Sequence, residues 1–269
     1  MSDAPRYLLC PPDHFRVEYS INPWMGGDVD PQVAMTEWLA LENAIIRAGA
    51  QVAIATPVAE LPDMVFSANA GAVKDGAVVI SNFKHPERQG ESEAYAKWFT
   101  DAGFAVHRLP PAMAFEGCGD VEFIDNVMIG GFGFRSELVA LENAAELLQA
   151  DYLVPMRLTD PRFYHLDTCF RYLGGPDRMA IYYPDAFLSE SSVLGMMKGL
   201  CNLTPISEED AVQFVCNSIV VGDTVIMPEN NAAITDKIIE AGFKVVQVRA
   251  GEFMKAGGSL RCLSLDITK

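Results

Sequence analysis

The hydrophobic pattern of the chain repeats a unit that opens with two short apolar segments joined by a tight turn. Such a pair is typical of a β-hairpin, and residues that favour positive φ angles or sharp bends occupy the turns. These turns are Asp75-Gly76, Asp125-Asn126, Gly174-Gly175-Pro176-Asp177 and Gly222-Asp223. The first strands are expected within residues 63–69, 115–120, 165–170 and 213–218, and their partners within 77–80, 127–130, 179–183 and 224–227.

A helix and a third strand are expected to complete each unit. After three of the hairpins, helical segments at 91–102, 136–149 and 232–241 lead to apolar segments at 104–107, 152–154 and 243–248. The N-terminal part has the same order, because a helix at 31–48, which Gly49 ends, precedes a strand at 51–55. The two ends of the chain supply a fifth hairpin, with residues 259–267 lying beside residues 6–10.

Five such units predict a closed ring of sheets. Units of roughly 45 to 52 residues indicate a five-bladed αβ propeller of the α/β class, with pseudo-fivefold symmetry and no free sheet edges. We expect residues 1–269 to form this propeller as one domain. The alternative is a doubly wound sheet, which the alternation of strands and helices also allows. The hairpins are antiparallel and no G-x-G-x-x-G motif follows a first strand, so the propeller is favoured.

Composition and charge limit the classes of partner. A chain with 50% hydrophobic and 21% charged residues can bury a large core, and its net charge of -16 repels phosphate backbones and anionic lipids. We therefore expect no nucleic-acid or membrane partner. No signal peptide and no apolar run of about 18 residues is visible, which predicts a cytoplasmic protein. The six cysteines include no C-x-x-C pair and there are four histidines, so we expect reduced thiols and no metal site.

The residues able to carry chemistry recur at one place in the unit. They lie on or beside the first strands of different hairpins, which converge on the axis of a ring: Asp63, Asn69, Glu116, His165, Asp167 and Cys262. A thiol, an imidazole and several carboxyl groups would then share one central site, as covalent catalysis requires. His165 and Asp167, two residues apart on a strand, would share a face.

Each of these residues also has an ordinary structural interpretation. Cys262 could be a buried core thiol, His165 a core histidine, and the Glu116 segment a glycine-rich turn. Gly257 and Gly258 favour a site near Cys262, because paired glycines let the backbone approach a ligand or donate amide hydrogen bonds.

Taken together, four motifs resemble a known enzyme family. Residues 63–69, 115–120, 163–170 and 257–265 are similar in order and spacing to the signatures of the guanidine-modifying superfamily. This group contains arginine deiminases, dimethylarginine dimethylaminohydrolases, amidinotransferases and arginine dihydrolases, and its fold is the five-bladed propeller called the pentein. The resemblance spans nearly the whole chain.

The resemblance implies a role for each central residue. Cys262 would attack the guanidinium carbon, and His165 would protonate the departing ammonia and then activate water against the S-alkylthiouronium intermediate. Glu116 would hold the guanidinium and assist proton transfer, and Asp167 and Asp63 would bind guanidinium nitrogens. A ring of carboxylates should raise the pKa of the cysteine, so that thiolate formation depends on the bound cation.

Three further residues are implied to hold the substrate. Arg135 matches the position that binds the α-carboxylate in relatives, whereas Arg88 is either a second such ligand or part of a mobile loop. Asn22, in Ile-Asn-Pro-Trp, matches a site residue of the dihydrolases, and it could otherwise be a loop N-cap.

Asn69 separates the branches of the superfamily. Deiminases and dimethylaminohydrolases carry an aspartate there, whereas a neutral amide can also accommodate a ureido oxygen. Asn69, together with residues 9–15, 20–25 and 87–91, resembles the arginine dihydrolase branch. That branch converts arginine without a cofactor into ornithine, carbon dioxide and two ammonia molecules.

Several alternatives remain open at this level. An arginine deiminase, a dimethylarginine dimethylaminohydrolase or a citrulline hydrolase would use the same residues, and a propeller without catalytic activity could bind a macromolecular partner. The sequence leaves homo-oligomerisation open. No further domain follows Lys269 in this sequence, so any coupling to an activity that consumes ornithine is expected in trans.

Overall fold

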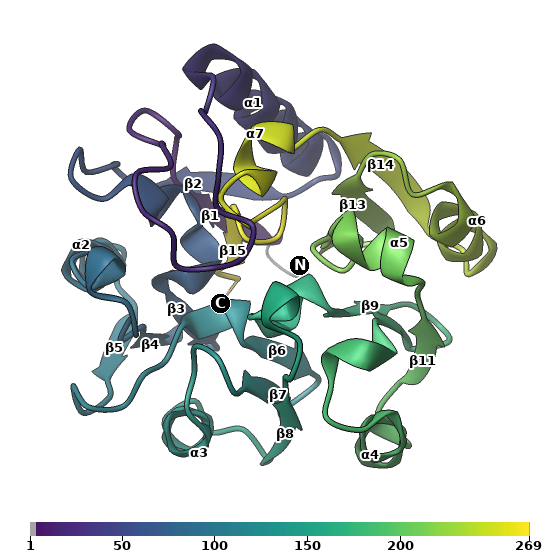
Figure 1. Cartoon of the computed structure of the whole chain (residues 1–269). Helices are drawn as coiled ribbons and strands as arrows, with labels where there is room; N and C mark the ends of the chain where they lie inside the picture. The colour runs from purple at the N-terminus through teal and green to yellow at the C-terminus, as the bar shows by residue number, and fades with distance from the viewer. Residues whose placement is uncertain (1–3, 269) are drawn as a thin grey trace.

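Five three-stranded sheets surround a common axis in the computed structural model, which describes residues 4–268 (Figure 1). In every sheet an inner strand pairs antiparallel with a middle strand, and the middle strand pairs parallel with an outer strand. From inner to outer strand, the sheets are β3 (Gly71–Lys74), β4 (Ala77–Ile80) and β5 (Ala105–Arg108); β6 (Val121–Ile124), β7 (Val127–Phe132) and β8 (Tyr152–Arg157); β9 (Phe170–Gly174), β10 (Met179–Tyr182) and β11 (Asn202–Pro205); β12 (Ile219–Val221), β13 (Thr224–Pro228) and β14 (Lys244–Val248); and β15 (Ser264–Asp266), β1 (Arg6–Leu9) and β2 (Gln51–Ile54). The predicted pentein fold is confirmed, and the doubly wound alternative is wrong.

In each sheet a helix connects the middle strand to the outer strand and lies on the outside of the ring, whereas the short helices Glu208–Val212 and Gly251–Met254 each follow an outer strand (Figure 1). The helices are α1 (Pro31–Arg47), α2 (Glu91–Asp101), α3 (Leu138–Leu147), α4 (Glu190–Met197), α5 (Glu208–Val212), α6 (Ala232–Glu240) and α7 (Gly251–Met254). In α1 the side chain of Asp30 caps the first turn, and Trp38, Leu41 and Ile45 are buried. The helices therefore supply the outer half of the core.

The ends of the chain close the ring as predicted. β15 pairs antiparallel with β1, with Tyr7 opposite Asp266 and Leu9 opposite Ser264. The expected domain also includes residues 1–3 and 269, which lie outside the described residues.

The motif segments are not strands, contrary to the prediction. Within the described residues, the motif segments form 3₁₀ turns, and each inner strand begins after them: Pro62–Val65 and Ser67–Ala70 precede β3, Gly117–Gly119 precedes β6, and Leu166–Thr168 precedes β9. Short polar side chains stabilise these turns by bonding backbone carbonyls, as Ser67 does with Leu8 and Leu263. His165 and Asp167 consequently do not follow the two-residue alternation of a strand.

No helix within residues 4–268 has the length and apolar character needed to cross a membrane. All six cysteines, which lie within these residues, carry free thiols.

Candidate active site

The 3₁₀ turns gather the predicted residues at one end of the axis. A small buried cavity there is lined by Ile21, Asn22, Met25, Asp63, Phe66, Asn69, Arg88, Arg135, Tyr164, His165, Ala256, Gly258 and Cys262. Glu116 and Asp167 lie directly behind this wall, in contact with His165 and Cys262. All nine residues predicted from the sequence are thus brought together.

The thiol of Cys262 lies between a carboxylate and an amide. Its Sγ is 3.3 Å from Asp167 Oδ2 and accepts a hydrogen bond from Asn217 Nδ2 at 3.1 Å. Asn217 Oδ1 also accepts from the Cys262 backbone N at 3.0 Å, which fixes the cysteine on the turn before β15. Burial, and then the negative charge of Asp167, raise the pKa of Cys262 well above that of an ordinary thiol. The cavity without substrate therefore holds a neutral thiol.

His165 and Glu116 form a buried pair opposite the thiol. His165 Nε2 and Glu116 Oε2 are 2.8 Å apart, and Arg135 Nη1 donates to the same oxygen at 2.9 Å. Burial alone would raise the pKa of Glu116, but the Arg135 guanidinium and the bond to His165 outweigh burial and lower it. Glu116 is therefore ionised and orients the imidazole.

Asp120 connects the second and third motifs. Its two oxygens accept backbone hydrogen bonds from Leu166 and Ser136, both at 3.2 Å. Burial raises its pKa to about 6, although His165 opposes this shift. Gly119 permits the close packing, because a Cβ there would lie 2.2 Å from Asn69 Nδ2. These contacts hold His165 against Glu116.

Arg88 forms the wall beside Asn69 and Asp63. Its guanidinium donates to both Glu91 oxygens at 2.8 Å and to Asn69 Oδ1 at 3.0 Å, and its Nε lies 3.9 Å from Asp63 Oδ2. Arg88 is only 3% exposed, so it is part of the cavity wall. This agrees with a substrate ligand better than with a mobile loop. Asn69 Nδ2 donates to the Glu116 carbonyl at 3.1 Å, which fixes the orientation of the amide.

Two carboxylate oxygens near the thiol lack partners. Among the described residues, Asp63 Oδ1 and Asp167 Oδ1 are buried and accept no hydrogen bond. Burial raises the pKa of Asp167 to about 7 and also raises that of Asp63, while nearby arginines oppose both shifts. The Tyr19 hydroxyl also lowers the pKa of Asp63, but it lies outside hydrogen-bond geometry to the free oxygen. Unpaired buried carboxylates are costly, and a cation with several N–H groups would satisfy them.

The loop that carries Asn22 and Trp24 closes the cavity above these residues. Asn22 accepts from the Trp24 backbone N at 2.9 Å and donates to the Ala256 carbonyl at 3.0 Å, and a Cβ at Gly257 would lie 2.6 Å from Asn22 Oδ1. Trp24 donates from Nε1 to the Arg162 carbonyl at 2.6 Å. The enclosed space is about 10 Å³, close to that of one water, so a larger molecule can enter only if this loop moves.

Arg135 is engaged from within the site in this closed arrangement. Besides Glu116, it donates to the Ile21 carbonyl at 2.9 Å and stacks over the Tyr164 ring at 4.6 Å. To bind a substrate carboxylate, as predicted, Arg135 would have to give up some of these contacts.

Asn217 is a site residue that the sequence analysis missed. The repeat could have identified it, because Asn69, Asn217 and Cys262 each stand two residues before an inner strand. Equivalent positions in the ring place all three side chains around the axis.

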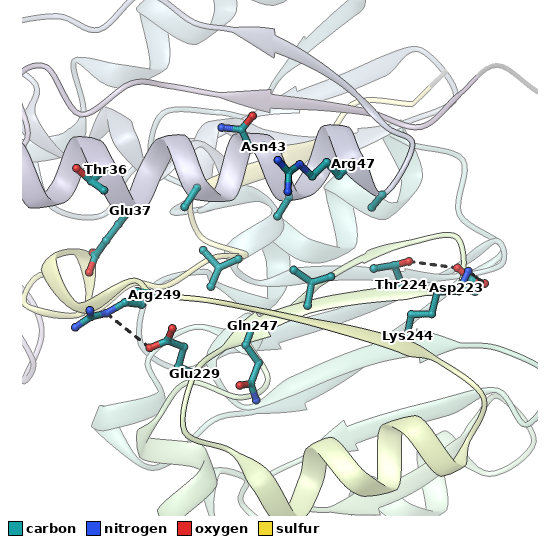
Figure 2. A pocket seen from close by; sticks show the side chains of 15 residues that line it. Thr36, Glu37, Asn43, Arg47, Asp223, Thr224, Glu229, Lys244, Gln247 and Arg249 are labelled. Carbon is teal, nitrogen blue, oxygen red and sulfur yellow. Dashed lines mark hydrogen bonds and ion pairs between the residues drawn. The ribbon is translucent and has the colours of Figure 1, made fainter.

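A wider cavity lies away from the axis, between α1 and β14 (Figure 2). Four of its charged side chains form two ion pairs, Arg249 with Glu229 and Lys244 with Asp223. It contains none of the predicted site residues. Among residues 4–268, no three His, Cys, Asp or Glu side chains are arranged to hold a metal ion.

Comparisons with known proteins agree with this geometry. The family model for eukaryotic N,N dimethylarginine dimethylhydrolase matches residues 21–269. The chain is 43% identical over its whole length to the bifunctional arginine dihydrolase/ornithine cyclodeaminase ArgZ of Synechocystis, of which it covers 38%. It is 36% identical to the dimethylarginine dimethylaminohydrolase of Mycobacterium tuberculosis, with 97% of this chain and 85% of that protein aligned.

The solved N-terminal domain of ArgZ, an arginine dihydrolase bound to product, superposes with a TM-score of 0.94. That likeness has 42% identity and covers 99% of this chain and 98% of the other. The chain spans 38% of the length of the two bifunctional cyanobacterial relatives. With the family model matching residues 21–269, the chain belongs to the N,N-dimethylarginine dimethylhydrolase family, within the guanidine-modifying superfamily that its motifs resemble.

Proposed function

We propose that this chain is a cysteine-dependent arginine dihydrolase, acting as a single catalytic domain in the cytoplasm on a small-molecule substrate and without a cofactor. The observation that carries the proposal is the position of the Cys262 thiol beside Asp167, in a cavity where buried carboxylate oxygens of Asp63 and Asp167 have no partner. A guanidinium cation supplies the missing donors.

Binding of the cation prepares the nucleophile. The positive charge of the guanidinium keeps Asp167 and Asp63 ionised and lowers the pKa of Cys262, which burial and Asp167 otherwise raise. The thiolate then attacks the guanidinium carbon. His165, held by Glu116, protonates the leaving ammonia, and an S-alkylthiouronium remains on Cys262.

Hydrolysis of this intermediate requires the same groups. His165 takes a proton from a water that attacks the thiouronium carbon, and release of the thiolate gives a ureido compound. A second cycle on the ureido group expels the other ammonia and then carbon dioxide, leaving ornithine. Two waters are consumed and two ammonia molecules leave.

Asn69 supports the second cycle. Its amide is neutral and its oxygen is occupied by Arg88, so the Nδ2 group is the part that can donate to a ureido oxygen. Solved structures of the ArgZ N-terminal domain include a cysteine-to-serine variant bound to substrate and an asparagine-to-serine variant covalently bonded to a reaction intermediate. The two altered residues are separated along that chain by the same distance as Asn69 and Cys262 are here.

We assign the α-carboxylate of the substrate to Arg135 and Arg88 in the cavity wall. Arg135 and Arg88 line the cavity together with Asn22, which lies on the loop that must open for the substrate to enter. Opening frees the contact of Arg135 with the Ile21 carbonyl on that loop, so its guanidinium can turn to a carboxylate.

Product analysis tests the proposal. Incubation with L-arginine should yield ornithine with two equivalents of ammonia and no lasting citrulline, as measured by amino-acid chromatography and an ammonia assay. Citrulline accumulating in equal amount with ammonia would instead establish a deiminase.

Dimethylarginine is the second candidate substrate, because the matching family model is that of a dimethylarginine dimethylhydrolase. Turnover of dimethylarginine or citrulline, in the absence of turnover of arginine, would move the assignment to those branches. If a cellular phenotype that depends on this chain persisted in Cys262→Ala, a propeller that binds a macromolecular partner would be favoured.

Replacement of Asn217 by alanine tests the alignment of the nucleophile. The change removes the hydrogen bonds to the Cys262 thiol and backbone, and we expect kcat to fall about 10-fold to 100-fold with a smaller change in KM. Steady-state kinetics with arginine measure both. Asn43→Ala, on the exposed side of α1, is the matched control, and equal kinetics for the two variants would contradict the positioning role.

A further inference from the structure

A second polar cavity lies at the other end of the inner strands. The catalytic turns precede β3, β6, β9 and β15, whereas most of the lining of this cavity lies on and after those strands, and only Cys118 and Arg261 reach it from the turns. The cavity shares no lining residue with the catalytic cavity. Its volume is about 350 Å³, within the range of small-molecule sites. The lining side chains that matter here are Lys74, Cys118, Glu122, Arg171, Arg261 and Asp266.

Two buried arginines in its wall have more donors than partners. Arg171 is 6% exposed and Arg261 is 4% exposed, yet both guanidinium groups share the single carboxylate of Glu122. Arg261 Nη2 is 3.9 Å from Glu122 Oε2, and Nη1 donates to the Ser264 carbonyl at 3.2 Å. Among the described residues, the Nε atoms of both arginines have no hydrogen-bond partner. Since each guanidinium has five N–H donors, an acceptor is missing.

The charge of the cavity changes from its depth to its rim. Two buried guanidinium groups against one carboxylate leave a positive charge at depth, while Asp75, Asp125 and Asp266 lie at the exposed rim. Asp75 pairs with Lys74 and Asp125 with Arg178, whereas the Asp266 side chain accepts hydrogen bonds, among residues 4–268, only from Thr268. The rim therefore offers a carboxylate for a cationic group.

We propose that this cavity binds a small zwitterionic amino acid, with its carboxylate on Arg171 and Arg261 and its ammonium group toward Asp266. The planar guanidinium fork matches a carboxylate, and the Asp266 carboxylate at the rim of the same cavity matches an ammonium group. The site is separate from the catalytic cavity, and binding to it does not depend on the proposed reaction, whereas its effect on KM rests on that reaction.

Arg261 connects this site to the nucleophile. It directly precedes Cys262, and its charge opposes the rise that burial causes in the pKa of Asp167. A bound carboxylate would neutralise part of that charge, which favours protonated Asp167 and weakens binding of a guanidinium. The ligand should thus raise KM for arginine more than it lowers kcat.

Isothermal titration calorimetry on the intact chain tests the site directly and requires no turnover. We expect L-alanine to bind more tightly than acetate, and Arg171→Gln to weaken both by about tenfold or more. Arg108→Gln, at an exposed ion pair with Glu93, should leave binding unchanged. Asp266→Asn should weaken binding of L-alanine and not of acetate.

Three results would overturn the proposal. These are the absence of binding at millimolar concentration, binding that survives Arg171→Gln, and tighter binding of inorganic phosphate than of L-alanine. If Arg171→Gln does not fold, Arg171→Lys keeps the charge beside Glu122 and removes the planar fork, and undiminished affinity in that variant would equally contradict the site.

Discussion

Replacement of Cys262 by serine is expected to reduce arginine turnover by about 10⁴-fold or more. The serine hydroxyl is nearly isosteric and can keep the contacts with Asn217, but its pKa lies far above that of a thiol. A bound cation that lowers the pKa of Cys262 enough for ionisation cannot do so for serine. Single-turnover kinetics measure the loss, and calorimetry should still detect arginine binding because Asp63 and Asp167 remain.

The matched control is Cys201→Ser. Cys201 is half-buried and lies outside the cavity, so its replacement should leave the rate within about twofold. If Cys262→Ser kept a tenth of the wild-type rate while Cys201→Ser was unaffected, covalent catalysis by Cys262 would be refuted.

The fold was predictable because its signals are local. Turn residues such as Asp75-Gly76 determine where a hairpin reverses, and both of them indeed adopt positive φ angles. Helix ends were equally clear, as at Gly49, whose φ is +102°. Closure of the ring by β15 and β1 followed from counting units, since a strand at each end of the chain had no partner nearby.

The conformation of the motifs was not predictable from the same signals. Apolar residues around Phe66 or Phe170 suit a strand, but Thr168 bonds the carbonyl of His165 three residues earlier and closes a 3₁₀ turn, while Ser67 ties its turn to the carbonyls of Leu8 and Leu263. The prediction therefore placed His165 and Asp167 on one strand face. In the structure they serve different partners, because His165 contacts Glu116 and Asp167 contacts Cys262.

The ion pairs inside the site also could not be predicted from the sequence. Arg88 with Glu91 and Arg135 with Glu116 depend on residues far apart or on side-chain geometry that no spacing specifies. They determine how many carboxylates are free. Glu116 is neutralised by Arg135, whereas Asp63 and Asp167 each retain an unpaired oxygen. The site therefore has capacity for one cationic group, which is what a guanidinium provides.

Replacement of Asn69 by aspartate should change the main product from ornithine to citrulline. A carboxylate keeps the bond with Arg88 and favours the cationic guanidinium, so the first hydrolysis should continue. It cannot donate to a ureido oxygen, and one of its oxygens would face the Glu116 carbonyl, now 3.1 Å from Nδ2. Loss of one such donor costs about 10²-fold to 10³-fold in rate, so ornithine formation should fall by at least about 10²-fold.

The time course of both products separates this role from a general loss of function. Asn69→Asp should consume arginine with one ammonia per citrulline, whereas Asn43→Asp on α1 should still give ornithine. Direct assay with citrulline as substrate isolates the second step, and only that step should fail in Asn69→Asp. Because Asn69 Nδ2 is the neutral donor beside Glu116, unchanged ornithine output from the variant would show that another group binds the ureido oxygen.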